Sequence, residues 1–198
     1  MKIRGLALDW DGVWTNGRKR QDGQSDFSEH DTMGLNLLRF AHFAQTGEVL
    51  RIALITGERN PTAEHVVQRE HFDHFLYYAR DKTKAIPILE EAWGIKAADW
   101  GFVFDDVLDL ELAAKVGRRA MVQWPATQAI QDIAAREGLV DDWIPTDSPI
   151  RHFCESYLKE QGWLEGAVAD RRSWSANYQA YWAMRNAISP QIIDLSPL

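Results

Sequence analysis

Cysteine and long apolar runs are the features that this sequence most clearly lacks. The 198 residues include one cysteine, Cys154, which excludes an internal disulfide framework and a cysteine-based zinc site. No apolar run approaches the ~20 residues of a membrane-spanning helix. The first residues, MKIRGLALDWDG, carry acids where a signal peptide is apolar. The sequence therefore predicts a cytoplasmic protein with no membrane partner.

Basic residues are also in the minority. Lysine and arginine number 22 against 29 aspartates and glutamates, a formal net charge of −7, and the acids are spread along the chain. A protein of this sign has no general attraction for nucleic acid, so we expect no nucleic-acid partner. With 45% hydrophobic and 26% charged residues, the composition is that of a globular protein with one sizeable core.

Three apolar runs end abruptly in polar residues. Residues 3–8 precede Asp9 and Asp11, residues 49–55 precede Thr56 and Gly57, and residues 100–104 precede Asp105. Helical spacing of apolar residues over 33–46, 61–70 and 82–93 alternates with these predicted strands. Further strands are predicted at 120–123 and 143–145, with helices at 127–137 and 149–162. The pattern predicts an α/β fold, a three-layer Rossmann-like parallel sheet, whose ligands bind at the carboxyl ends of the strands.

Two segments fall outside this alternation. Residues 14–30 are polar and interrupted by glycines, and the pair Asp22-Gly23 predicts a β-hairpin inserted after the first strand. Residues 163–198 are rich in tryptophan and tyrosine, and we expect a C-terminal helical tail there. Residues 1–162 are accordingly predicted to form the main domain.

The sharpest local signal is the segment LALDWDGVWTNG, in which Asp9 and Asp11 follow an apolar strand. Two carboxylates so close repel each other unless a cation or a proton relieves them. The segment resembles the first motif of the haloacid dehalogenase-like (HAD) phosphatases. The resemblance is greatest to the capless subfamily that includes 3-deoxy-D-manno-octulosonate 8-phosphate phosphatase.

Three further segments follow in the order of that family: ITGE up to Glu58, Lys82 in RDKTKAI, and FDDVLD from Phe104 to Asp109. The resemblance implies that Asp9 is the nucleophile, that Asp11 is the general acid and base, and that the cofactor is Mg²⁺. It implies these further roles: phosphate binding by Thr56, Gly57 and Lys82; metal binding by Asp9, Asp11 and Asp105; and support of the metal-bound water or of the lysine by Asp106 and Asp109.

The resemblance also implies a substrate and an assembly. The substrate would be a small phosphorylated metabolite, a phosphosugar acid of the octulosonate or nonulosonate type, and the assembly a homotetramer without a large cap domain. The segment FSEHDTMG and the helix that begins IRHFCE are similar to subfamily segments, and they place Asp31, His30 and Arg151 at the substrate pocket.

Two departures from the family keep alternatives open. Phe104 stands where the fourth motif has glycine, and His30 stands where the subfamily has arginine. The alternatives are a phosphatase for another sugar or nucleotide phosphate, and a catalytically idle homologue that serves as an assembly or regulatory partner. A receiver domain of the response-regulator type is disfavoured, because receiver domains do not have the DxDGV motif that this sequence carries. Read singly, Lys82 competes with Lys84 as the site lysine, and Asp106 and Asp109 are ordinary acids at a helix N-terminus.

Overall fold

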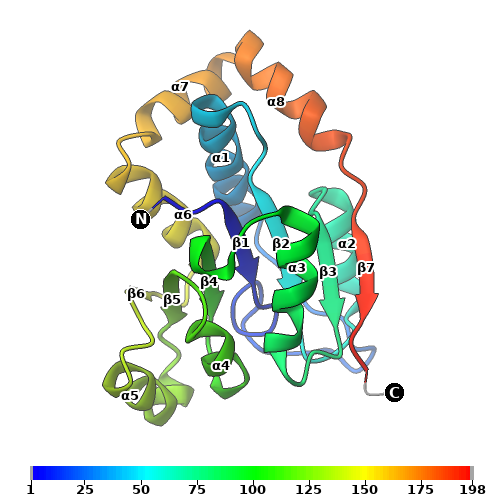
Figure 1. Ribbon diagram of the computed structural model, residues 1–198, viewed down its shortest axis with the longest axis vertical. Coiled ribbons are helices and arrows are strands. Elements are labelled where there is room, and N and C mark those ends of the chain that lie inside the picture. Colours follow the sequence, from blue (N-terminus) through cyan, green and yellow to red (C-terminus); the bar gives the residue numbers. More distant parts are fainter. Residues whose placement is uncertain (1, 197–198) are drawn as a thin grey trace.

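Seven parallel strands form the centre of the molecule, in the order β6-β5-β4-β1-β2-β3-β7 (Figure 1). The structure is a computed structural model that describes residues 2–196. The strands are β1 (Gly5–Leu8), β2 (Arg51–Ile55), β3 (His74–Tyr77), β4 (Trp100–Phe104), β5 (Arg118–Val122), β6 (Asp142–Ile144) and β7 (Gln191–Asp194). All neighbouring strands pair in parallel, so the predicted α/β parallel sheet is confirmed.

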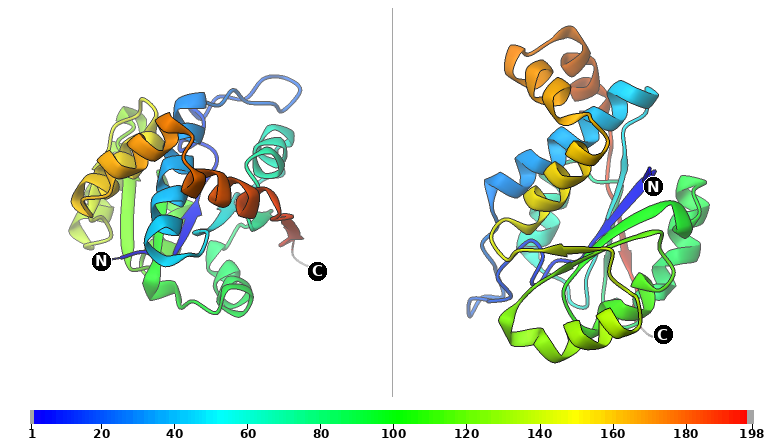
Figure 2. Two further views of the ribbon diagram at one scale, coloured as in Figure 1. Left: turned by 90° about the horizontal axis from the view of Figure 1, so that it is seen from above. Right: turned by 90° about the vertical axis from the view of Figure 1, so that its left-hand side faces the viewer.

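Helices cover both faces of the sheet (Figure 2). The helices within residues 2–196 are α1 (Glu29–Thr46), α2 (Pro61–Arg69), α3 (Ala85–Trp93), α4 (Leu110–Ala113), α5 (Gln128–Arg136), α6 (Pro149–Glu160), α7 (Leu164–Ser173) and α8 (Ala176–Asn186). Of these, α7 and α8 pack against α1 beyond the end of the sheet. Successive strand residues face opposite sides: Leu6 and Leu8 pack in a core with α1, α2 and α6, whereas Ala7 packs in a second core with α3, α4 and α5. The result is a three-layer sandwich. None of the helices in residues 2–196 combines the length and apolar character needed to cross a membrane.

Strand order creates a crevice at the centre of the sheet. β1 pairs with β2 on one side and with β4 on the other. After β3 the chain therefore returns across β1 to start β4. At such a reversal the connections leave the carboxyl ends of the two strands in opposite directions, which opens a ligand site between them. The segments that follow β1 and β4 meet there.

Helix boundaries follow local capping. Helix α1 begins at Glu29, four residues before the predicted start, because the Ser28 hydroxyl accepts a hydrogen bond from the His30 N–H at 3.1 Å. It ends at Thr46 and is capped by Gly47, whose left-handed φ of 78° suits glycine. In α3, Pro87 lies in the first turn, where a proline needs no hydrogen-bond donor, so the helix continues unbroken to Trp93.

Two expectations about strands require correction. The prediction of two hairpin strands within residues 14–30 is wrong, because residues 14–28 form an irregular loop. Its turn is present, since the Arg20 N–H donates to the Gln24 carbonyl oxygen at 2.9 Å. An isolated two-stranded hairpin is barely stable in water, and these residues are largely exposed. Conversely, β3 was not predicted, because its run of four residues is too short to be distinguished by periodicity.

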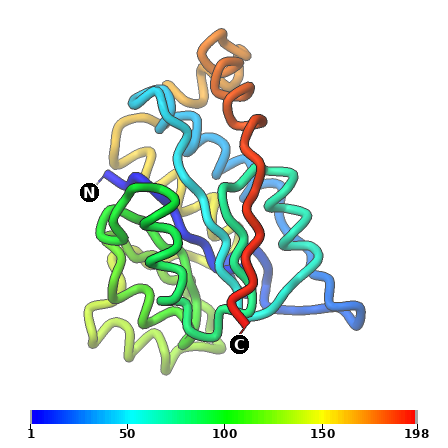
Figure 3. The backbone as a smooth tube through the Cα atoms, turned by 45° about the vertical axis from the view of Figure 1, so that its right-hand side comes forward, coloured from blue at the N-terminus to red at the C-terminus, as the bar shows by residue number. Residues whose placement is uncertain are grey.

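The C-terminal tail is not helical throughout. It supplies α7 and α8, but then runs along the edge of the sheet as β7 (Figure 3). Ile192 of β7 is in register with Phe75 of β3. Helix α8 packs on α1 through Tyr178 and Tyr181, both fully buried. The prediction of a purely helical tail is therefore wrong for residues 191–194, while the proposed domain boundary at 162 stays a prediction.

Candidate active site

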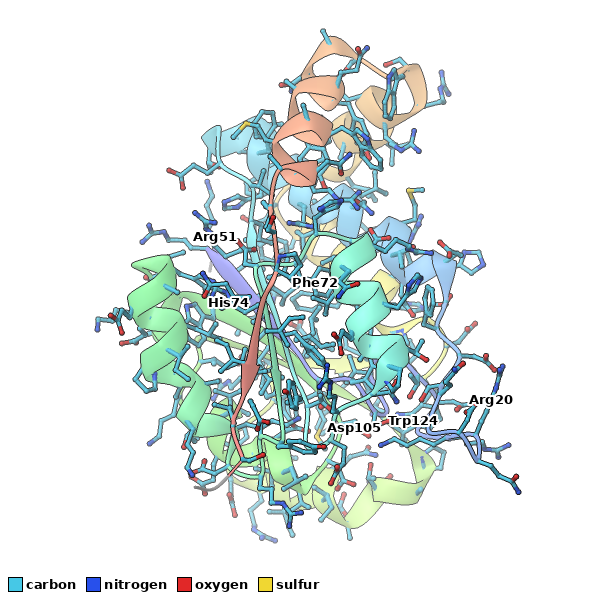
Figure 4. All side chains as sticks on the ribbon, turned by 90° about the vertical axis from the view of Figure 1, so that its right-hand side faces the viewer. Arg20, Arg51, Phe72, His74, Asp105 and Trp124 are labelled. Carbon is cyan, nitrogen blue, oxygen red and sulfur yellow. The ribbon has the colours of Figure 1, made fainter. Side chains whose placement is uncertain are left out.

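Three carboxylates converge at the crevice between β1 and β4. Asp9 follows β1, Asp105 follows β4, and Asp109 closes a 3₁₀ turn at Val107–Asp109. One oxygen from each lies within 4.8 Å of the others. They line a cavity of about 310 Å³ at the carboxyl end of the sheet, where Figure 4 labels Asp105.

Lys82 is the counter-ion of this group. It begins the 3₁₀ turn Lys82–Lys84 ahead of α3, and its side chain is buried. Its Nζ lies 2.5 Å from Asp9 Oδ1 and 2.5 Å from Asp109 Oδ1. Lys84, the alternative weighed on sequence, is exposed. Although burial lowers the pKa of Lys82, the carboxylates of Asp109 and Asp9 outweigh it and raise that pKa above its ordinary value.

One lysine does not neutralise three acids. Burial raises the pKa of Asp9 to about 7, against the opposing pull of Lys82. Burial, together with the nearby carboxylates of Asp9 and Asp109, raises the pKa of Asp105 to about 9. A buried cluster with excess negative charge binds either protons or a cation. Its all-oxygen donor set suits a hard divalent cation such as Mg²⁺.

A tight loop brings these carboxylates together. Gly12 has a φ of 85°, and a Cβ at this position would come within 1.9 Å of Asp105 Oδ2. Only glycine permits both this conformation and this close approach. The Gly12 carbonyl oxygen also accepts a hydrogen bond from the Trp124 indole N–H at 2.7 Å. The DWDG loop is thus held at both sides, by β4 and by the residues after β5.

Other residues expected at the phosphate line the same cavity. Thr56 and Gly57 follow β2, and Asp11 and Asp106 contribute from two other loops. Thr56 is fixed by the unpredicted strand: its N–H donates to the Leu76 carbonyl oxygen at 2.9 Å. The Asp11 side chain lies outside the three-carboxylate group and pairs with Lys19 instead. The Asp106 carboxylate accepts from the Val107 N–H at 2.7 Å and so caps the following 3₁₀ turn.

The residues expected at the substrate pocket lie outside the cavity of the three carboxylates. His30 and Asp31 line a second cavity, of about 400 Å³, beside the loop 14–28. Asp31 is buried, its Oδ1 accepts from the Arg151 N–H at 2.8 Å, and burial raises its pKa to about 6. It therefore stabilises the start of α6. The Arg151 guanidinium turns along α6 to pair with Glu155, and among residues 2–196 it lines neither cavity.

Comparisons with known proteins agree with this architecture. No family model matches the sequence, and no curated protein matches it. Solved structures do match. One is a protein from Legionella pneumophila assigned to subfamily III A of the HAD hydrolases: TM-score 0.69 and 24% identity over 86% of this chain and 90% of that one. The chain has the HAD hydrolase fold.

Two 3-deoxy-D-manno-octulosonate 8-phosphate phosphatases share this fold. The protein from Moraxella catarrhalis, solved with magnesium, phosphate and the sugar acid, gives a TM-score of 0.66 and 23% identity over 84% of this chain and 92% of its own. The cobalt-bound protein from Haemophilus influenzae gives 0.67 and 20%, over 81% and 90%. At these identities the likeness is one of fold.

The departure at Phe104 does not disturb the HAD-type crevice. Phe104 is fully buried among the core residues under α3, and it does not line the cavity. Its ring stacks on Phe102 with centroids 5.2 Å apart. The bulk of this side chain therefore enters the core, and it does not lie between Asp105 and the other carboxylates.

Sequence reasoning missed two residues that contact the motif loop. Trp124 follows the predicted fourth strand, so its position at the carboxyl edge was a usable signal for a contact with the site. Lys19 lies in the loop 14–28 and pairs with Asp11 at 2.9 Å. No spacing rule places a lysine eight residues after an aspartate at ion-pair distance, and only the path of the loop does so.

Proposed function

We propose that this HAD-fold protein is a Mg²⁺-dependent phosphomonoesterase that acts through an aspartyl-phosphate on Asp9. The observation that carries the proposal is the buried group of Asp9, Asp105 and Asp109 around Lys82, at the crevice of a parallel sheet. The comparisons support the hydrolase and phosphatase class. Magnesium and the residue roles rest on the geometry and on the motif resemblance.

The residues present fit the metal. The close oxygens of Asp9, Asp105 and Asp109 and the raised pKa values of Asp9 and Asp105 indicate a site with uncompensated negative charge. These carboxylates would hold Mg²⁺, with the main-chain carbonyl of Asp11 as a further donor. When bound, Mg²⁺ supplies positive charge that neutralises the phosphoryl oxygens and relieves the repulsion among the acids.

The chain's own residues account for the chemical steps. The Asp9 carboxylate attacks phosphorus, and Asp11 donates a proton to the oxygen of the leaving alcohol. Lys82, with Thr56 and Gly57, binds the phosphoryl oxygens, whose negative charge increases in the transition state. Asp11 then takes a proton from the water that hydrolyses the aspartyl-phosphate. Asp109 keeps Lys82 charged and oriented through the 2.5 Å ion pair.

The substrate we propose is a small phosphosugar acid such as an octulosonate 8-phosphate or a nonulosonate 9-phosphate. The second cavity, about 400 Å³ in volume, would hold the sugar moiety while the smaller one holds the phosphoryl group. The second cavity is lined by basic residues and by three acids: Arg18, Lys19, Arg20 and His30, and Asp26, Asp31 and Asp147. Asp26 pairs with Arg20, so Arg18 and the exposed Lys19 are the cations that an anionic group would meet there. The Moraxella catarrhalis structure contains such a sugar acid.

The test is phosphate release from a panel of phosphosugar acids, neutral sugar phosphates and nucleotides, each with Mg²⁺ and with chelator. Chelator-sensitive release from one group supports the proposal and names the substrate class. The Asp9→Asn variant is the matched control, since it removes the nucleophile and keeps the side chain's shape. No release by folded, Mg²⁺-binding protein would favour the idle homologue, for which the buried Phe104 now gives no support.

We extend the proposal to assembly as a homotetramer in the cytoplasm. Val107 and Leu108, in the turn that follows Asp106, are 59% and 52% exposed, and they are apolar side chains that a neighbouring subunit would cover. Light scattering after size exclusion measures the mass directly. A single species at the mass of one chain would refute this part of the proposal and leave the reaction untouched.

A further inference from the structure

An ion pair separates the two cavities. Lys19 Nζ lies 2.9 Å from Asp11 Oδ2. Asp11 lines the smaller cavity, with the carboxylates, and Lys19 lines the larger one. A substrate whose phosphoryl group lies at Asp9 and whose leaving group extends into the larger cavity passes this pair.

The larger cavity is lined by a run of three basic residues from the loop 14–28 and also by Asp26, Asp31 and Asp147. The Arg20 guanidinium is engaged by Asp26, and Lys19 is engaged by Asp11. Arg18 forms no ion pair within residues 2–196. Figure 4 shows Arg20 on the loop that projects from the same end of the molecule as Asp105. Of the three, Lys19 is the one tied directly to a residue of the smaller cavity.

The Lys19–Asp11 pair is easily exchanged. The side chains are 38% and 32% exposed, and an ion pair so open to water contributes only ~0–1 kcal/mol. The lysine ammonium group is a compact charge on a flexible side chain, so it can turn to a second carboxylate and form an equivalent ion pair with it. An incoming anion that offers comparable contact therefore competes for Lys19 at little cost.

We propose that Lys19 is the specificity-determining residue for an anionic group on the leaving alcohol. In the free protein Lys19 holds the Asp11 carboxylate at the boundary of the two cavities. A carboxylate on the leaving group takes over the ion pair, which binds the substrate and frees Asp11 toward the ester oxygen. The inference rests on the proposed function, whose reaction it makes selective for phosphorylated acids over phosphorylated neutral sugars.

The experiment compares two probes that differ in one group. These are 6-phosphogluconate, which has a carboxylate at C1, and glucitol 6-phosphate, which has a hydroxymethyl group there. Steady-state kinetics are measured for the wild type, Lys19→Met, Lys19→Arg and the control Lys96→Met. Lys96 also forms an exposed ion pair, with Glu90 at 2.8 Å, but it lies ahead of β4, at the opposite end of the sheet.

We expect the wild type and Lys96→Met to prefer 6-phosphogluconate by at least tenfold in kcat/KM. In Lys19→Met the preference falls to about unity through a higher KM for the acid alone, and Lys19→Arg restores most of it. An unchanged preference in Lys19→Met would refute the inference. An equal loss of kcat on both probes would refute it too, since Lys19 would then act only by positioning Asp11.

Binding separates this inference from the proposed reaction. Calorimetry with Asp9→Asn, alone and combined with Lys19→Met, measures the affinity for each probe without turnover. A preference for the acid that disappears only in the double variant supports the role of Lys19 even if no wild-type phosphate release is found. Turnover of both probes with equal affinities would leave the phosphatase proposal standing and refute the role of Lys19.

Discussion

Asp105→Asn should stabilise the metal-free fold while it removes metal binding. Asp105 is 9% exposed, and its pKa is raised to about 9 by burial and by Asp9 and Asp109. At pH 7 this carboxyl is held neutral in the folded protein and ionises in the unfolded chain, which has an ordinary pKa near 4. The gap between pH 7 and the pKa of the unfolded chain is about three pH units. At ~1.36 kcal/mol per unit, it corresponds to a ceiling of about 4 kcal/mol of lost stability.

The sign of the pH dependence follows from the same values. A carboxyl whose pKa is raised on folding does not lower the free energy of unfolding at pH values below its unfolded pKa. Above that pH the loss of stability grows, until the pH passes the folded pKa. Wild-type stability in chelator should therefore fall between about pH 4 and about pH 9. Asp9, with a pKa raised to about 7, adds to the fall up to that pH. In Asp105→Asn the fall should be shallower.

The assay is thermal unfolding in chelator and in excess Mg²⁺ from pH 5 to pH 8. Relief of half the ceiling raises the Tm of Asp105→Asn by roughly 4–8 °C in chelator for a chain of this size. Mg²⁺ at about 100 times its Kd stabilises the wild type by ~2.7 kcal/mol and the variant by little. Asp132→Asn, an exposed site on α5, is the matched control for charge. A variant less stable than the wild type in chelator, or parallel pH curves, would refute the reasoning.

Three further predictions concern the supports of the site and of the tail. Gly12→Ala should abolish Mg²⁺-induced stabilisation in the same assay, because its Cβ would come within 1.9 Å of Asp105 Oδ2. Trp124→Phe should lower kcat about fivefold to tenfold with KM unchanged in steady-state kinetics, since it removes a hydrogen bond worth ~1 kcal/mol to the Gly12 carbonyl oxygen; equal kcat would refute it. Arg185→Met should lower the free energy of unfolding by ~3–5 kcal/mol in urea titrations, because it leaves Glu70 buried without its 3.2 Å partner; a loss under ~1 kcal/mol would show that Arg69 suffices.

The sequence was most informative where apolar strands end in acids. β1, β2 and β4 were each predictable because a buried parallel strand is apolar on both faces, and the residues after it carry the chemistry. Parallel pairing then places Asp9 and Asp105 at one edge, so the location of the site could be predicted without coordinates. The choice of lysine needed the motif resemblance as well. Lys82 and Lys84 differ in burial, which the structure shows and the sequence does not.

Tertiary contacts decided what the sequence could not show. The short strand β7 carries only two consecutive apolar residues, Ile192 and Ile193, and it forms because α8 delivers it to the open edge of β3. The Asp22-Gly23 turn was read correctly, but no neighbouring strand exists to extend it into a hairpin. Asp31 lines the second cavity, as the motif led us to expect for a pocket residue, but its second contact, with the Arg151 N–H at the start of α6, is a tertiary contact that the motif does not show.

The position of Phe104 shows why a motif departure has to be judged in three dimensions. Alternation along β4 sends Phe102 and Phe104 to the face covered by α3, and Val103 to the other face. The carboxylates lie beyond the end of the strand, so neither face's side chains occupy their space. The close approach that requires a residue without Cβ is made from the facing loop, by Gly12. The glycine that matters to Asp105 is thus on β1's side of the crevice, and a bulky residue before Asp105 is compatible with an intact site.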